Sequence, residues 1–162
     1  MVFDMHKLQK LSVLALKLNS KIVSAESCTA GLLSASLTEI PGSSAFFEQG
    51  YITYSNLSKT SVLGVENKIL EKYGAVSEQV AKQMAVGALK RSNSTIAISI
   101  TGIAGPGGSD CKPEGLVCFA VTKENGKIRT ETMEYGPLGR SKVRSSAVKT
   151  AINLLLEEMS VI

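Results

Sequence analysis

The chain has 162 residues, the size of one ordinary domain, so we expect a single domain over residues 1–162. Apolar residues make up 44% of it and charged residues 20%, which is typical of a globular protein with a sizeable core. The net charge of +4 favours anionic small molecules, and with four Phe, four Tyr and no Trp a stacking platform for single-stranded nucleic acid is not expected.

Neither a membrane span nor a signal peptide is expected. No apolar run reaches the ~20 residues that cross a bilayer. The amino-terminal segment is interrupted by charges such as Asp4 and Lys7, and it lacks a small-residue cleavage site. The three cysteines, Cys28, Cys111 and Cys118, are an odd set, which favours reduced thiols and a cytoplasmic location.

The only histidine is His6, which falls in the first expected helix. A Ser-His-Asp or Cys-His arrangement would have to use it, and the cysteines and carboxylates do not have the spacing of a zinc site. We therefore expect no metal and no cofactor. If the chain is an enzyme, its general base is expected to be a residue other than histidine.

Helical and strand patterns alternate along the chain. In order, they predict a helix over 4–19, a strand over 21–25, a helix over 29–39, a turn at Pro41-Gly42, a strand over 50–55, helices over 55–63, 66–73 and 77–91, a strand over 94–101, a glycine-rich loop over 102–115, strands over 116–123 and 127–135, and a helix over 139–158. Asn125-Gly126 predicts a hairpin between the last two strands. This order predicts a three-layer α/β/α sandwich with a mixed, mostly parallel sheet.

Three polar or glycine-rich stretches follow expected strands: ESCTAG, YSNLSK and TGIAGPGG. In open α/β sheets, ligands bind outside the carboxyl ends of the strands. We therefore expect these stretches to meet in one site.

Ser27 lies where the first strand gives way to a helix, so its Oγ is expected among free backbone N–H groups. The N–H groups of Cys28 and Thr29 are candidate donors to an oxyanion. Two other interpretations stay open here: Ser27 or Thr29 is only the helix N-cap, and Glu26 either pairs with a charge in the site or orients its loop. Cys28 itself is expected to be a small buried thiol.

Lys59 and Tyr54 follow the second strand, which brings them toward Ser27 if the two strands are neighbours. A lysine serves as a base for serine when burial or nearby positive charge lowers its pKa. Tyr54 could then hydrogen-bond Ser27 or Lys59 and relay a proton. The alternatives are a solvated helix lysine and a strand-end aromatic residue.

The glycine-rich loop is expected to bring Gly102, Ala104 and Gly105 against the substrate, since glycine lets a ligand approach the backbone closely. Arg140 and Arg144 are one turn apart in the last expected helix, so both could hold a phosphate. The alternatives are a plain connection and a solvated basic face.

The runs SAESCTAG, PGSSAFFEQGYITYSNLSK and SITGIAGPGG, with KPEG and GRSKVR after them, resemble the CinA C-terminal-domain family of nicotinamide-nucleotide amidohydrolases. The resemblance implies the α/β/α fold, a homodimer, and hydrolysis of nicotinamide mononucleotide to nicotinate mononucleotide and ammonia in pyridine-nucleotide salvage. It also implies a serine nucleophile at Ser27, a lysine base at Lys59 and an active-site tyrosine at Tyr54. The amino-terminal pyrophosphatase-like domain of many relatives is not expected here.

Three other functions remain open at this stage. The chain could be a non-catalytic nucleotide-binding module of the same fold, or an amidase for another small amide. A DNA-associated protein is the third, although the modest charge comes with no recognition motif, so no specific nucleic-acid partner is expected.

Overall fold

The computed structural model describes residues 4–161, and the ends of the expected domain span, 1–162, lie outside the described residues. Five strands form one sheet in the order β2-β1-β3-β4-β5. They are β1 (Ile22–Glu26), β2 (Phe47–Ile52), β3 (Ile96–Gly102), β4 (Leu116–Lys123) and β5 (Ile128–Glu134). Strand β1 pairs in parallel with both β2 and β3, whereas β3-β4 and β4-β5 pair in antiparallel fashion. The predicted mixed sheet is confirmed.

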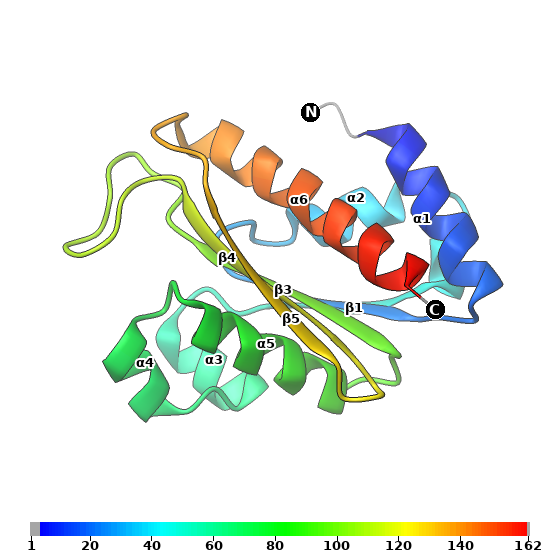
Figure 1. Cartoon of the computed structure of the whole chain (residues 1–162), viewed down its shortest axis with the longest axis horizontal. Coiled ribbons are helices and arrows are strands. Elements are labelled where there is room, and N and C mark those ends of the chain that lie inside the picture. Colours follow the sequence, from blue (N-terminus) through cyan, green and yellow to red (C-terminus); the bar gives the residue numbers. More distant parts are fainter. Residues whose placement is uncertain (1–3, 162) are drawn as a thin grey trace.

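Helices cover both faces of the sheet (Figure 1). They are α1 (Met5–Lys17), α2 (Leu32–Thr38), α3 (Asn56–Leu63), α4 (Asn67–Tyr73), α5 (Glu78–Lys90) and α6 (Arg140–Ser160), with a short 3-10 turn, η1 (Ser43–Ala45). Helices α1, α2 and α6 lie on one face and α3, α4 and α5 on the other (Figure 1). The predicted α/β/α sandwich is therefore confirmed. Among residues 4–161, no helix is long and apolar enough to cross a membrane.

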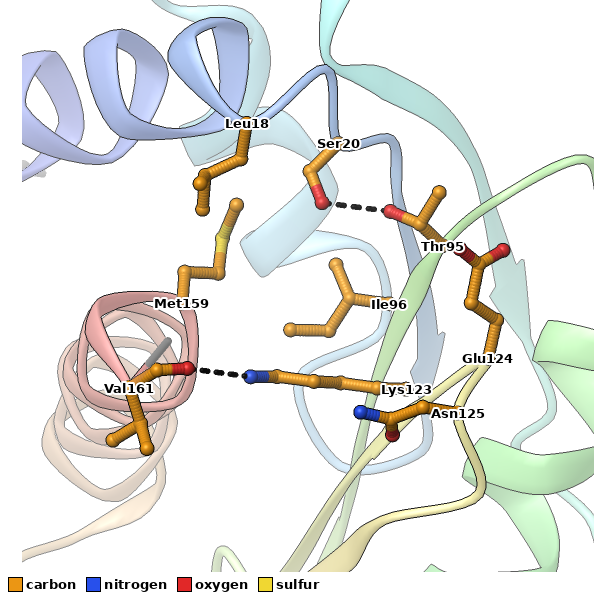
Figure 2. A pocket seen from close by; sticks show the side chains of 9 residues that line it. All are labelled: Leu18, Ser20, Thr95, Ile96, Lys123, Glu124, Asn125, Met159 and Val161. Atoms are coloured by element: carbon orange, nitrogen blue, oxygen red, sulfur yellow. Dashed lines mark hydrogen bonds between the residues drawn. The ribbon is translucent and has the colours of Figure 1, made fainter.

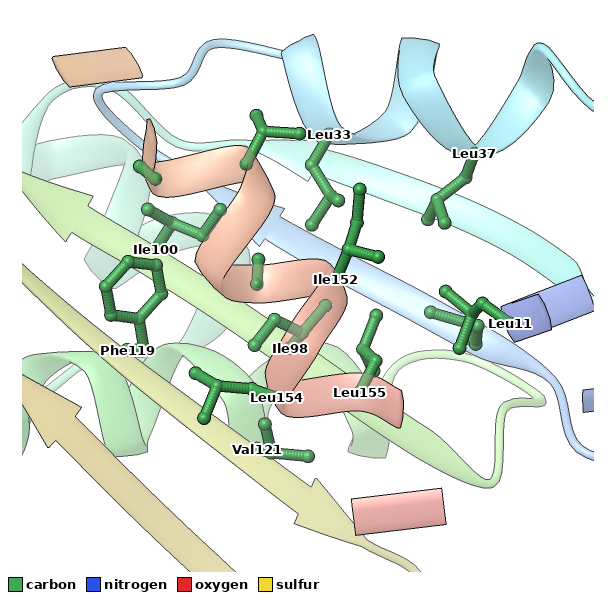
Figure 3. Packing of buried hydrophobic residues seen from close by; sticks show 14 of the residues in the cluster. Leu11, Leu33, Leu37, Ile98, Ile100, Phe119, Val121, Ile152, Leu154 and Leu155 are labelled. Atoms are coloured by element: carbon green, nitrogen blue, oxygen red, sulfur yellow. The ribbon is translucent and has the colours of Figure 1, made fainter. Parts of the chain in front are cut away.

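Each face of the sheet has its own hydrophobic core. Ile98 and Ile100 of β3 pack with Phe119 of β4 against α6, which contributes Ile152 and Leu155 (Figure 3). The opposite core lies between the sheet and α3–α5. Because both faces are covered, β1 is buried along its whole length, as expected of a central parallel strand.

The connections place the carboxyl ends of β1, β2 and β3 at one edge of the sheet. The chain passes from β1 through α2 to β2 on one side of β1, and then through α3–α5 to β3 on its other side. These two connections run over opposite faces of the sheet (Figure 1). Strand order reverses at β1, and such switch points are where open α/β sheets bind ligands. Ser27 follows β1 directly at this point.

Two of the predicted boundaries are wrong in a way that matters for the site. The helix expected over 29–39 begins only at Leu32, because residues 27–31 form a turn. The strand expected over 50–55 runs over Phe47–Ile52 instead. The backbone N–H of Thr53 still donates to the Glu26 carbonyl at 2.9 Å, but the carbonyls of Thr53 and Tyr54 accept hydrogen bonds from the Lys59 side chain.

Candidate active site

Ser27 is fixed at the carboxyl end of β1 by the neighbouring strand. Its backbone N–H donates to the carbonyl of Ile100 in β3 at 2.9 Å, which continues the parallel pairing by one residue. The residue is 8% exposed, so its hydroxyl group lies at the margin of the protein interior.

The cap of α2 is the side chain of Glu26, which is fully buried. Its Oε2 accepts the backbone N–H groups of Gly31 and Leu33, each at 3.0 Å. Its Oε1 accepts the backbone N–H of Ser34 at 2.9 Å and the Ser34 hydroxyl at 2.7 Å. A carboxylate is a stronger acceptor than a hydroxyl and suits the positive end of a helix. The interpretation of Ser27 or Thr29 as N-cap is therefore wrong, and Glu26 orients the loop.

The turn after Ser27 leaves two backbone donors free. The N–H groups of Cys28 and Thr29 donate no hydrogen bond to another of the described residues, whereas that of Ala30 donates to the Ser27 carbonyl at 3.1 Å. Ala30 has a φ of +48°, which is unusual for a residue with a side chain. Two adjacent N–H groups without a partner among the described residues, beside a serine hydroxyl, are candidate donors to an oxyanion.

Lys59, on α3, extends into the interior toward Ser27 and is only 1% exposed. Its Nζ lies 2.9 Å from Ser27 Oγ, 2.9 Å from the Thr53 carbonyl and 3.1 Å from the Tyr54 carbonyl. Burial lowers the pKa of this lysine from 10.5 to about 8. The predicted approach of Ser27 and Lys59 is thus present in the structure.

This geometry suits a lysine that acts as a base. A neutral amine has two N–H groups and one lone pair. When its two N–H groups donate to the carbonyls of Thr53 and Tyr54, the lone pair is directed at the Ser27 hydroxyl. The two carbonyls therefore orient the amine, and burial makes its neutral form accessible near physiological pH.

The hydroxyl of Tyr54 has a different partner from the one expected. The phenol is 56% exposed and accepts a hydrogen bond from Arg140 Nη2 at 2.8 Å. Only the main-chain carbonyl of Tyr54 contacts Lys59, and no hydrogen bond joins the phenol to Ser27 or Lys59 among the described residues. A proton relay through this hydroxyl is not present in the structure, and the phenol lies at the outer rim of the site.

Arg140 and Arg144 come from successive turns of α6 but contact different parts of the site. Arg140 Nη1 donates to the Gly105 carbonyl at 3.0 Å, in addition to its bond with Tyr54. Arg144 Nη2 donates to the Thr29 carbonyl at 3.0 Å, within the turn that follows Ser27. The two guanidinium groups therefore do not form the joint clamp expected from their spacing. Arg140 lies at the rim, and Arg144 supports the turn.

Two residues of the glycine-rich loop serve packing rather than close approach of a ligand. A Cβ atom at Gly102 would lie 2.7 Å from a methyl group of Val117 on β4. Ala104 is buried in the core beneath the loop. Gly105 precedes a cis peptide bond to Pro106 and has a φ of +85°, so this part of the loop does use the conformational freedom of glycine.

The thiol of Cys28 points into the protein and is 4% exposed. Burial raises its pKa from 9.0 to about 11, so the thiolate is disfavoured at neutral pH. This agrees with the expectation of a buried thiol, and it leaves Cys28 as a backbone donor only.

Residues 5–159 match the CinA C-terminal domain family. The chain belongs to this family. It is 50% identical over 139 residues to a CinA-like protein of Chlorobium phaeobacteroides, covering 82% of this chain and 33% of that protein. It is 44% identical over 138 residues to a protein of Enterobacter agglomerans named nicotinamide-nucleotide amidohydrolase PncC, covering 85% of this chain and 84% of that one. The chain thus spans about a third of the length of the CinA-like proteins.

Solved structures of CinA-family proteins have the same fold. A competence/damage inducible protein of Agrobacterium tumefaciens superposes with a TM-score of 0.90 at 42% identity, covering 97% of this chain and 98% of that one. A competence damage-inducible protein A of Klebsiella pneumoniae superposes with a TM-score of 0.93 at 31% identity, covering 99% of both chains.

A cavity lies at the edge of the sheet opposite to Ser27 (Figure 2). This cavity of about 310 Å³ is lined by residues that precede β1 and β3 and by the end of α6, among them Ser20, Thr95 and Met159. Lys123 extends across it toward the Val161 carbonyl, where it helps to satisfy the end of α6 (Figure 2). No residue expected in the CinA-type site lines this cavity.

Sequence reasoning did not single out Glu114, which contacts both the glycine-rich loop and the start of α6. The signal available was its place in the KPEG run at the end of that loop. Glu26 was noticed, but its capping role depends on bonds to residues five to eight positions later, and helix-start patterns do not describe such bonds.

Proposed function

We propose that this chain hydrolyses the carboxamide of nicotinamide mononucleotide, giving nicotinate mononucleotide and ammonia in pyridine-nucleotide salvage. The observation that carries the proposal is the buried contact of 2.9 Å between Ser27 Oγ and Lys59 Nζ. The name of the Enterobacter agglomerans relative, which matches most of this chain, supports the choice of reaction and substrate.

In the first step, neutral Lys59 takes the proton of the Ser27 hydroxyl while Ser27 Oγ attacks the carboxamide carbon. The carbonyl oxygen gains negative charge and is held by the free N–H groups of Cys28 and Thr29. Glu26 and Arg144 support these donors, since both bind the backbone of the turn or of the helix that follows it.

In the second step, the C–N bond breaks and the ammonium form of Lys59 gives its proton to the departing amine, which leaves as ammonia. The acyl group stays on Ser27 as an ester. A water molecule, deprotonated by the same lysine, attacks the ester, and Ser27 recovers its proton. Each turnover consumes one water, and the lysine ends in its starting protonation state.

The rest of the substrate would be held at the rim. Arg140 provides the exposed guanidinium group beside Tyr54 and Gly105, which suits the phosphate of a mononucleotide. Tyr54 offers an aromatic face and a hydroxyl at the same rim. Binding energy from the phosphate would position the unreactive amide against Ser27.

The first test is product analysis with purified protein and nicotinamide mononucleotide, measuring ammonia and nicotinate mononucleotide in equal amounts. A panel of other small amides, run beside it, tests the choice of substrate. Binding of the nucleotide without ammonia release would favour a non-catalytic module. Faster turnover of another amide would move the assignment to that compound.

We also propose that the chain acts as a homodimer in the cytoplasm, as the family resemblance implies. Light scattering of the purified protein tests the first part, since a dimer has twice the 17.1 kDa mass of one chain. Cell fractionation tests the second. A monomer in solution, or recovery outside the cytoplasmic fraction, would contradict the corresponding part of the proposal.

A further inference from the structure

Glu114 joins the glycine-rich loop to the first turn of α6. Its Oε2 accepts the backbone N–H of Gly107 at 2.6 Å, and its Oε1 accepts the backbone N–H of Gly139 at 3.0 Å. Gly139 is the N-cap residue of α6 and directly precedes Arg140. One carboxylate therefore fixes both the loop and the helix start from which Arg140 extends.

Arg140 also binds the glycine-rich loop. Its Nη1 donates to the carbonyl of Gly105, two residues before the loop N–H that Glu114 binds. The loop is thus held at Gly105 by Arg140 and at Gly107 by Glu114. Movement of either the loop or the helix start would displace the Arg140 guanidinium group from its present place beside Tyr54.

The fit between Glu114 and the loop is close. A Cβ atom at Gly105 would overlap Glu114 Cδ, so a side chain at that position is incompatible with the observed carboxylate. At Gly108 a Cβ atom would lie 2.5 Å from the Lys112 carbonyl. The glycine-rich first half of the loop therefore packs directly against the KPEG run at its end, and Glu114 binds it at Gly107.

The Glu114 carboxylate also places a negative charge beside the start of α6. Backbone N–H groups at a helix start attract anions, and the first turn of α6 carries no acidic residue of its own. Glu114 takes the N–H groups of Gly107 and Gly139, so these two donors are satisfied, and Arg140 adds an exposed guanidinium group at the same rim for a ligand phosphate.

We propose that Glu114 is a positioning residue, which holds Arg140 and the glycine-rich loop so that the site prefers a phosphorylated nucleotide over the unphosphorylated nucleoside. The inference rests on the proposed function, because it concerns the phosphate of the same substrate. It assigns Glu114 no contact with the reacting amide.

The test compares nicotinamide mononucleotide with nicotinamide riboside in the wild type, Glu114→Gln and Glu114→Ala. A glutamine keeps the shape but places an N–H donor where one acceptor oxygen stood, so one of the two bonds is lost. We expect kcat/KM for the mononucleotide to fall about tenfold or more, mainly through KM, and kcat/KM for the riboside to change less than about twofold. Asp110→Asn, which removes an exposed charge from the same loop, is the matched control and should behave as the wild type.

A double-mutant cycle with Arg140→Ala sharpens the test. If Glu114 acts through Arg140, Glu114→Ala should add little to the loss already caused by Arg140→Ala. Equal losses on both substrates would show a general structural role and overturn the inference, as would an unchanged or increased preference for the mononucleotide.

Failure of the proposed function would look different. If folded wild-type protein released no ammonia from the mononucleotide, calorimetry with the same compound would replace turnover. Weaker binding by Glu114→Ala than by the wild type would then support the role of Glu114. Equal binding by both proteins, or no binding by the wild type, would contradict it.

Discussion

Lys59 Nζ lies 2.9 Å from Ser27 Oγ, although the two residues come from separate strand–helix units. Ser27 follows β1 and Lys59 lies on α3, which follows β2. The parallel pairing of β1 with β2 brings these chain segments together at one edge of the sheet. The lysine is oriented by main-chain carbonyls rather than by a carboxylate, so within residues 4–161 no ion pair stabilises its charged form.

The pH dependence of the reaction follows from this environment. The lysine acts as a base only when neutral, and its pKa is lowered to about 8. We expect kcat/KM to rise about tenfold per pH unit below this value and to level off above it. Steady-state rates from pH 6 to 10, corrected for substrate stability, measure the profile. A flat profile over this range would exclude Lys59 as the base.

Stability should depend on pH through the same residue. The native pKa is about 8 and the ordinary value is 10.5, so between these values the unfolded chain binds more protons and the free energy of unfolding rises with pH. Below about pH 8 both states are protonated and no further change occurs. Lys59→Met lacks this titration, so the wild type should gain up to about 3 kcal/mol relative to it between pH 8 and 10.5.

Denaturant unfolding of both proteins at several pH values measures this difference. The remaining ionisable groups are shared, so their contributions cancel in the comparison. A difference that stays constant from pH 7 to 10.5 would mean that the native lysine titrates as it does in the unfolded chain.

Substitutions of Arg140 and Arg144 in α6 should have different effects on the kinetic constants. Arg140 lies at the rim, so Arg140→Ala is expected to raise KM for the mononucleotide roughly 10- to 100-fold with a smaller effect on kcat. Arg144 binds the turn that carries the proposed oxyanion donors, so Arg144→Ala is expected to lower kcat by roughly 10- to 100-fold.

Lys142→Ala, an exposed position on the same helix, serves as the control for loss of positive charge and should change neither constant by more than about twofold. Matching kinetic effects for Arg140→Ala and Arg144→Ala would argue for the joint phosphate clamp that their spacing had suggested.

The cysteines should differ sharply in reactivity. Cys111 is exposed, whereas Cys28 and Cys118 are buried and burial raises the pKa of both thiols. In native protein at pH 7.5, a thiol reagent should therefore modify one cysteine rapidly and the other two only after unfolding. Cys111→Ser should abolish the rapid phase. Fast modification of Cys28, with loss of activity, would contradict this prediction and would favour a thiol nucleophile over Ser27.

Much of the fold followed from local patterns. Strand β4 matches its predicted range of 116–123, because an apolar run ends at an Asn-Gly turn. The start of α2 did not follow, because its cap is a buried glutamate from the preceding strand instead of a hydroxyl at the N-cap position. The spacing of residues therefore predicted which helices and strands exist better than it predicted where each one begins and ends.

Some contacts of the candidate site could also be predicted from the sequence, and others could not. The approach of Lys59 to Ser27 was expected on the condition that their strands are neighbours, because parallel strands end at the same edge, and the structure meets that condition. Arg140 and Arg144 were expected to act together from their spacing, but long side chains one turn apart reach different partners. A glycine is required at position 102 because the backbone there packs against Val117 on another strand. The pattern of residues around Gly102 does not reveal this contact.

The most direct test of the Ser27–Lys59 pair is turnover of nicotinamide mononucleotide by Ser27→Ala, Lys59→Ala and the double variant, each shown to be folded. Residues that act as one catalytic unit are strongly non-additive. Each single variant should therefore lose at least about 10³-fold in kcat, and the double variant should be no slower than the slower single one. Retention of activity within about tenfold of the wild type by either single variant would contradict the account.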